Sequence, residues 1–425
     1  MKQFGILVLL CFALPVNAQS FIGQINYGKS VIHYQIKLTQ TANRTNAFFS
    51  SVAMNAYEIP CQNTTFEKDT LAFYVVSDYY TYAYQYHKQN KNLKGHLKVY
   101  ANEDERLLDT FETELIQENS TERDAVNKQE VSFTSNGLKL YGTVWKPQKS
   151  KQMGLVFVTS SQGNDRSGAN TEASYFTKLG YTVFNYDKRG TGKSEGNWQS
   201  ATLEELCSDD STAIRYFAKI TKLPLAKIGI KGSSQGGIKI PYILTKIPEL
   251  NFGISVSCPS GTLLESDLNH WKNMHLDRIG PKNIALALRV QKAAYDFLAG
   301  NISYKQMNAI TNTYAHHDWF KYIYIPEENI QKDAKLNFSG LPYFKKITQP
   351  ILIVQGLSDN VIPKNSHNLI AKALQQSASN THDILTLENT THAMTYLDQE
   401  FPYFQTLSPN YLPAIAKWLN TIENQ

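Results

Sequence analysis

The sequence lacks the marks of several protein classes. Only four of its 425 residues are cysteines, and none has the C-x-x-C spacing of a zinc site or a redox motif. Basic residues outnumber acidic ones by only 42 to 37, which is too small an excess to indicate nucleic-acid binding. No apolar run approaches the roughly 20 residues needed to span a bilayer. We therefore expect no metal, no nucleic-acid partner and no membrane span.

The first 20 residues have the pattern of an export signal. Lys2 is followed by an apolar run from Phe4 to Val16, and Val16-Asn17-Ala18 fits the small-residue preference of a signal peptidase. An uncleaved membrane anchor is the alternative, but about a dozen apolar residues are too few to cross a bilayer. We predict a signal peptide over residues 1–18, cleaved after Ala18, with export to a periplasm or to the cell exterior.

Cleavage would remove one of the four cysteines. Cys61, Cys207 and Cys258 would remain, and three thiols can form at most one disulfide. Cys207 lies in a segment with a helical pattern and Cys258 follows an apolar strand. In such places a buried free thiol is the commoner role.

Residues 19–125 have a β-type pattern, rich in Tyr, Phe, Thr and Val and broken by Asn, Gly and charged clusters. Tyr82, Tyr84 and Tyr86 alternate as a strand would present them on one face. Aromatic packing across a sheet is favoured over a ligand-binding surface. We predict a small β-rich accessory domain with no visible catalytic equipment. Its strands are expected to include residues 30–38, 70–76 and 95–100.

The polar stretch from Gln117 to Gln129 has the composition of a connector, and beyond it the pattern changes. Apolar strands there alternate with helix-length segments, which indicates a mostly parallel sheet flanked by helices. Residues 126–425 are therefore predicted to form an α/β domain. A helical stretch over about 261–344 interrupts the alternation and is predicted to be a cap above the sheet. The predicted strands are 139–145, 153–159, 181–186, 227–231, 252–257, 351–355 and 384–388.

A G-x-S-x-G pattern lies between one of these strands and a helix. The strand 227–231 leads directly into Gly232-Ser233-Ser234-Gln235-Gly236, and apolar residues at helical spacing follow. In the tight turn of a nucleophile elbow, side chains two residues either side of the serine would collide, so glycine is required there. This predicts Ser234 as a nucleophile. Ser233 is the competing serine, but the residue two positions after it is Gln235.

A serine nucleophile needs a base and a carboxylate that orients the base. Asp359 follows the strand 351–355, and His392 follows the strand 384–388. Ser, Asp and His thus occur in the order used by one hydrolase fold, each just past a strand. We expect these three residues to form a catalytic triad. The neighbouring alternatives are Asp383, Asp398, His382 and His367, of which His382 and Asp383 open a strand and His367 lies in a predicted helix.

Donors for an oxyanion are expected in two places. The backbone N–H of Gln235 directly follows the nucleophile, and a second N–H should come from the loop after the strand 153–159. Ser161 is the predicted donor in that loop and Gln162 is the reserve. The opposing interpretation is an ordinary flexible loop.

From about residue 126 to the C-terminus, these motifs resemble the α/β-hydrolase superfamily. The run from Tyr186 to Ser194 is similar to its Y-D-x-R-G-x-G-x-S turn, which implies structural roles for Asp187 and Arg189. Asn164-Asp165-Arg166 resembles the oxyanion loop of an esterase subgroup with an extra N-terminal domain, although Ser160 and Gln162 replace two glycines. Relatives of this kind include bacterial carboxylesterases and hydrolases related to prolyl oligopeptidase.

The resemblance implies a serine hydrolase without a cofactor that acts on a small-molecule ester through an acyl-enzyme. A peptidase or amidase on the same triad is the alternative, motivated by the cap and the accessory domain. A non-catalytic binding protein is a third hypothesis, which the occupied triad positions disfavour.

Overall fold

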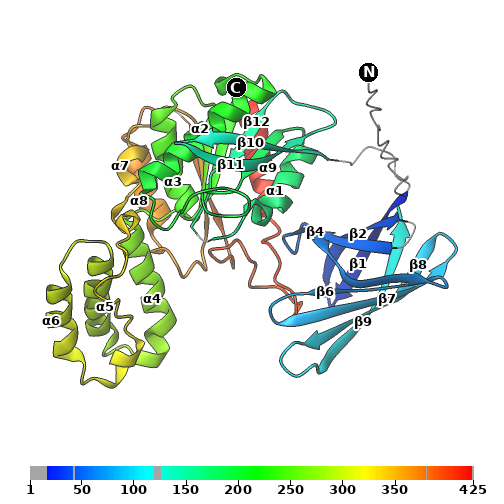
Figure 1. Ribbon diagram of the computed structural model, residues 1–425, viewed down its shortest axis with the longest axis horizontal. Coiled ribbons are helices and arrows are strands. Elements are labelled where there is room, and N and C mark those ends of the chain that lie inside the picture. The colour runs from blue at the N-terminus through cyan, green and yellow to red at the C-terminus, as the bar shows by residue number, and fades with distance from the viewer. Residues whose placement is uncertain (1–16, 42–43, 119–125, 162, 380, 424–425) are drawn as a thin grey trace, which may run out of the picture. The chain divides into compact units, whose positions relative to one another are not determined.

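The computed structural model describes residues 17–41, 44–118, 126–161, 163–379 and 381–423. These divide into two compact units (Figure 1). One unit comprises the chain up to Arg123 together with Gln399–Gln405, and the other comprises Asp124–Asp398 and Thr406–Gln425. Most of the predicted signal peptide, residues 1–16, lies outside the described residues. Each unit is described by itself below.

The first unit is built on a nine-stranded sheet whose neighbouring strands are all antiparallel. The strand order is β4-β3-β2-β1-β9-β8-β7-β6-β5, so neighbours in the sheet are consecutive in the chain except for β1 and β9. The strands are β1 (Asn17–Tyr27), β2 (Ser30–Thr41), β3 (Arg44–Ser51), β4 (Ala56–Pro60), β5 (Gln62–Glu67), β6 (Thr70–Val76), β7 (Tyr80–Gln89), β8 (Asn92–Ala101) and β9 (Leu107–Gln117). The predicted β-rich N-terminal region is therefore confirmed.

Aromatic side chains fill the core of this unit. Tyr82, Tyr84 and Tyr86 alternate along β7 and are all buried, as their spacing predicts. The hydroxyl of Tyr34 shares a hydrogen bond of 2.7 Å with that of Tyr86 and one of 2.5 Å with the hydroxyl of Thr113. Buried tyrosine hydroxyls must find partners, and these satisfy one another. Packing inside the sheet accounts for the tyrosines, as predicted.

The segment Gln399–Gln405 completes that core from a distant part of the chain. The ring of Phe404 stacks on Tyr82 with centroids 4.9 Å apart, and the Tyr82 hydroxyl donates to the carbonyl of Tyr403 at 2.7 Å. Phe401 is buried in the same cluster. Phe401 and Phe404, from near the C-terminal end of the chain, are thus part of the hydrophobic core of the N-terminal unit.

The second unit contains an eight-stranded mixed sheet in the order β10-β11-β13-β12-β14-β15-β16-β17. Strands from β13 to β17 in this order run parallel, whereas β10–β11 and β11–β13 pair antiparallel at one edge. The strands are β10 (Asn127–Ser135), β11 (Leu138–Lys146), β12 (Gly154–Phe157), β13 (Thr182–Tyr186), β14 (Ile228–Ser233), β15 (Phe252–Val256), β16 (Ile351–Gly356) and β17 (His382–Leu387). This is the predicted α/β-hydrolase fold.

The prediction of a connector up to Gln129 was wrong at its end. Asn127, Lys128 and Gln129 belong to β10, where they pair with the end of β11. Polar residues suit this edge strand because the residues at its start are exposed. Polarity alone therefore could not distinguish a solvated strand from a linker.

Helices flank the sheet and form the cap (Figure 1). The flanking helices are α1 (Asn170–Lys178), α2 (Leu203–Thr221), α3 (Gln235–Lys246), α7 (Leu341–Phe344), α8 (Ser366–Leu374) and α9 (Tyr411–Glu423). The cap follows β15 and contains α4 (Leu263–Ile279), α5 (Ile284–Leu298) and α6 (Tyr304–Tyr314). Trp271, Val290 and Trp319 are buried in a small hydrophobic cluster of the cap. The cap thus has packing of its own.

The structure also bears on the cysteines and on the predicted absence of a membrane span. Cys207 and Cys258 are buried free thiols, as predicted, and the remaining described cysteine, Cys61, is also free. Among the helices in the described ranges, none combines the length and apolar character needed to cross a membrane.

Candidate active site

The turn between β14 and α3 has the strained geometry of a nucleophile elbow. Ser234 has φ 55° and ψ −118°, a backbone conformation that residues with side chains rarely adopt. A Cβ on Gly232 would lie 2.5 Å from the carbonyl of Gly236, and one on Gly236 would lie 3.0 Å from the carbonyl oxygen of Val158. The steric requirement for both glycines is therefore visible in the structure.

Ser234 lies at the tip of this turn, and Gln235 is the first residue of the helix that follows it. The Ser234 N–H donates to the carbonyl of Val256 at 2.9 Å, which fixes the elbow against β15. Gln235 begins α3, and N–H groups in the first turn of a helix have no acceptor within the helix. The backbone N–H of Gln235 is therefore suited to bind negative charge beside the serine. Ser233 instead ends β14.

His392 and Asp359 form a hydrogen-bonded pair. Nδ1 of His392 lies 2.8 Å from Oδ2 of Asp359, whose side chain is fully buried. Oδ1 of Asp359 accepts from the backbone N–H groups of Val361 at 2.8 Å and Ile362 at 3.2 Å. A carboxylate at Nδ1 favours the tautomer that carries the proton there. In that tautomer Nε2 of His392 carries no proton and can accept one.

The loop that carries His392 is attached to the end of β15. The hydroxyl of Ser257 donates to the carbonyl of His392 at 2.7 Å. Among the alternatives, Asp383 lies in β17 and accepts from Nε1 of Trp418 at 2.8 Å, and His367 lies in α8. These two residues belong to the scaffold rather than to the pair described above.

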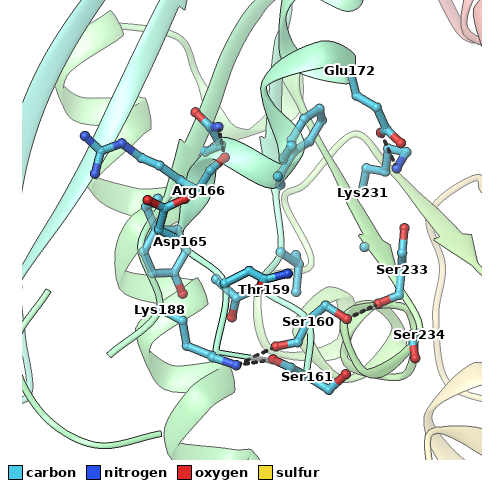
Figure 2. Close-up of a pocket in the computed structure, with 18 of the residues that line it drawn as sticks. Thr159, Ser160, Ser161, Asp165, Arg166, Glu172, Lys188, Lys231, Ser233 and Ser234 are labelled. Carbon is cyan, nitrogen blue, oxygen red and sulfur yellow. Dashed lines mark hydrogen bonds and ion pairs between the residues drawn. The ribbon is translucent and has the colours of Figure 1, made fainter. Parts of the chain in front are cut away.

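Three of the candidate residues line one cavity of about 350 Å³. Ser234, His392 and Ser161 all contribute to its wall, so the predicted nucleophile, base and second oxyanion residue face one space. Figure 2 shows the loop with Ser160 and Ser161 beside Ser233 and Ser234. Gln162, the reserve donor, lies outside the described residues.

The wall of the cavity also holds charged residues that the sequence analysis did not single out. Nζ of Lys231 forms an ion pair of 2.5 Å with Glu172, and Glu172 also accepts from the hydroxyl of Tyr411 at 2.9 Å. Burial raises the pKa of Tyr411 well above its ordinary value, so this hydroxyl stays protonated. In the sequence, the lysine near the end of the otherwise apolar strand β14 was the signal that could have indicated this ion pair. The cavity is therefore not a purely apolar acyl tunnel.

The Tyr186–Ser194 turn is held by buried ion pairs. Asp187 accepts from the side chain of Arg166 and from the backbone N–H of Lys193 at 3.0 Å. Arg189 makes two hydrogen bonds to Asp209, at 2.6 and 3.0 Å. Bidentate pairs of this kind fix geometry. Their contacts are those of residues that brace the floor of the site.

Within the part of the chain that the structure describes, no group of three or more His, Cys, Asp or Glu side chains is arranged to hold a metal ion. The arrangement offers a hydroxyl, an imidazole paired with a carboxylate, and N–H donors. Acyl transfer needs these groups.

The chain is similar to known proteins in sequence and in fold. The sequence model of the family described as X-Pro dipeptidyl-peptidase (S15 family) matches residues 136–394, whereas no curated protein sequence matches. Similar solved structures include an esterase from Pyrococcus furiosus (13% identity, TM-score 0.47, 72% of this chain and 95% of that one). A proline iminopeptidase from Mycobacterium smegmatis has 14% identity and a TM-score of 0.46, covering 69% of this chain and 99% of that one. A putative dipeptidyl aminopeptidase IV from Bacteroides ovatus has 13% identity and a TM-score of 0.45. The match covers 92% of this chain and 48% of that one.

Proposed function

This protein belongs to the X-Pro dipeptidyl-peptidase family (S15), and we propose that it is a serine hydrolase that cleaves carboxylic ester bonds through an acyl-enzyme at Ser234. The observation that carries the proposal is the 2.8 Å hydrogen bond between His392 and Asp359. His392 lines the same cavity as Ser234, whose backbone is strained. A hydroxyl on an elbow beside an oriented imidazole is equipped for nucleophilic attack.

The proposed reaction has two halves. Nε2 of His392 takes the proton of Ser234 as its Oγ attacks the acyl carbon, and the imidazolium then protonates the leaving group. Asp359 stabilises the imidazolium and keeps its Nδ1–H in place. The oxyanion accepts from the N–H groups of Gln235 and Ser161. Water then attacks the acyl-enzyme with His392 again as base, and the acid is released.

The test is reaction with a fluorophosphonate probe together with hydrolysis of short-chain 4-nitrophenyl esters. Labelling and turnover are both expected for the wild type, and both should be lost in Ser234→Ala. Ser233→Ala is the matched control, because it removes the adjacent hydroxyl and should still be labelled. Undiminished turnover by Ser234→Ala would reject the assignment. A folded wild type that neither reacts with the probe nor hydrolyses esters or peptides would favour the non-catalytic hypothesis.

A second candidate activity, peptide cleavage on the same three residues, is supported by the family description. An amine is a poorer leaving group than an aryl alcohol, so a peptidase must protonate it efficiently from the imidazolium. Comparing kcat/KM for an X-Pro-4-nitroanilide with that for an ester of the same acyl group separates the two. A higher value for the anilide would assign the protein to peptide substrates, and an unmeasurable value would leave ester hydrolysis.

A further inference from the structure

The loop after β12 is fixed by side chains from three directions. Nζ of Lys188 donates to the carbonyl of Ser160 at 2.8 Å and also to the carbonyl of Ser161. The hydroxyl of Ser160 donates in turn to the carbonyl of Ser233, 2.8 Å away, directly before the nucleophile (Figure 2). The loop is thus tied to the elbow on one side and to Lys188 on the other.

A buried ion pair fixes the start of the same loop. Oδ1 of Asp210 on α2 accepts from the backbone N–H of Thr159 at 3.1 Å and from its hydroxyl at 3.2 Å. Oδ2 of Asp210 pairs with Nζ of Lys239 at 2.6 Å, and Lys239 on α3 is completely buried. Charges buried in this way need full pairing, and their geometry is correspondingly fixed. Thr159 therefore cannot shift without losing its two hydrogen bonds to Asp210.

These contacts determine where the loop's N–H groups point. In a trans peptide, the C=O of one residue and the N–H of the next point in opposite directions. Because the carbonyl of Ser160 faces Lys188, the N–H of Ser161 faces away from Lys188. Figure 2 shows Lys188 and Ser234 on opposite sides of this loop. The N–H of Ser161 is accordingly turned toward the side where the nucleophile lies.

We propose that Lys188 is a positioning residue for the oxyanion hole, which together with the Ser160 hydroxyl holds the N–H of Ser161 toward Ser234. The inference rests on the function proposed above. Lys188 touches no reacting atom and acts through the backbone that it binds. The Y-D-x-R-G turn thereby has a second role, since its variable position supplies this lysine.

The charge of Lys188 adds a property that can be measured. Burial, together with the nearby charges of Lys239 and Lys335, lowers its pKa to about 7 against the opposing effect of Asp210. Its ammonium also lies 4.1 Å from the centroid of the Trp198 ring. Above about pH 7 the group loses its charge, and hydrogen bonds from a charged donor are the stronger ones. The hold on the two carbonyls should therefore weaken as pH rises.

The test is Lys188→Met, which keeps an unbranched side chain and removes the donors. We expect kcat/KM for a 4-nitrophenyl ester to fall on the order of 100-fold, as for loss of one oxyanion donor. The affinity for phenylboronic acid, which forms a tetrahedral adduct with the serine, should fall by a similar factor. Wild-type kcat is expected to decline severalfold above about pH 7, and this decline should be absent in the variant. Lys193→Met, on the same turn but bound to the exposed Glu130, should stay within twofold of wild type.

Unchanged kcat/KM and boronate affinity in folded Lys188→Met would overturn the inference, and so would a loss confined to KM. If that variant does not fold, Ser160→Ala tests the other tie, with an expected fivefold to tenfold lower kcat and unchanged KM. Wild-type kcat in Ser160→Ala would then overturn the inference. Failure of the proposed function is a separate result, because wild type itself would show neither turnover nor labelling at Ser234.

Discussion

Asn273 on the cap helix α4 donates from Nδ2 to the backbone carbonyl of Asn360, 2.7 Å away, and Asn360 directly follows Asp359. One helical turn earlier, Nδ2 of Asn269 donates to the carbonyl of Val361 at 2.9 Å. The N–H of Val361 in turn donates to Asp359. The cap is therefore hydrogen-bonded to the loop that positions the carboxylate partner of His392.

Removal of the Asn273 side-chain amide is predicted to slow catalysis. Asn273→Ala loses one hydrogen bond worth about 1 kcal/mol of stability, which leaves the Asp359 loop less firmly held, so kcat for ester hydrolysis should fall by at most roughly fivefold. Asn312→Ala removes an exposed amide on α6 and should leave kcat unchanged. Equal kcat for the two variants would show that the cap does not steady the Asp359 loop.

Asp359→Asn is predicted to lower kcat far more than it lowers stability. An amide can present N–H to the imidazole and favour the wrong tautomer, a change that costs about 10⁴-fold in a serine protease triad. Asp383→Asn is the matched control, because that carboxylate bonds to Trp418. Steady-state kinetics beside thermal melting separates the two effects. A loss below tenfold in Asp359→Asn would argue against its role.

Gly232→Ala is predicted to destabilise the fold and abolish activity. The added Cβ would lie 2.5 Å from Gly236, so the elbow would have to move. Overpacking of this kind costs roughly 1–3 kcal/mol. Gly168→Ala adds the same methyl group where nothing lies within 4 Å, and it should melt at the wild-type temperature. If Gly232→Ala melts there too, the elbow is less constrained than it appears.

The thiols of the half-buried Cys61 and the buried Cys258 are predicted to react slowly in the folded protein. Burial raises the pKa of both Cys61 and Cys258 to about 12, and the thiolate is the reactive form. At pH 8 only a small fraction is ionised, so Ellman's reagent should react little until guanidinium unfolds the chain. Rapid reaction of either thiol in the native protein would contradict this expectation. Assays with single Cys→Ser variants would identify the thiol responsible.

Much of the candidate site could be predicted because its determinants are local. The positions of Gly232, Ser234 and Gly236 follow from a steric rule that acts over five residues. Asp359 and His392 follow predicted strands, and parallel strands place their carboxyl ends at one edge of a sheet. The order of these residues in the chain and their places after strands were therefore enough to predict them.

Other parts of the site could not be predicted because they depend on tertiary contacts. The burial of Lys188, Asp210 and Lys239 is created by helices and strands far apart in the chain, and isolated charged residues are normally interpreted as exposed. The pairing of β10 with β11 was missed for a similar reason, since its exposed residues are polar. Hydrophobic periodicity in a sequence predicts which face of a helix or strand is apolar, but it does not predict which charged side chains will pair with one another.

Phe404→Ala is predicted to destabilise the N-terminal unit. Truncating this buried ring, which stacks on Tyr82, should cost roughly 3–5 kcal/mol of folding free energy. Leu397→Ala is the control, because that side chain is 58% exposed. Chemical denaturation monitored by tyrosine fluorescence measures the difference. Equal midpoints for the two variants would show that the segment Gln399–Gln405 contributes little.

The origin of that segment has a consequence for biosynthesis. The ribosome makes all strands of the nine-stranded sheet early, but Phe401 and Phe404 emerge some 280 residues after β9 ends. Until then the nascent N-terminal unit must leave the site for these rings unfilled while the entire hydrolase sheet is being made. A fragment that stops before this segment should consequently be less stable and more prone to aggregate than its sequence alone would suggest.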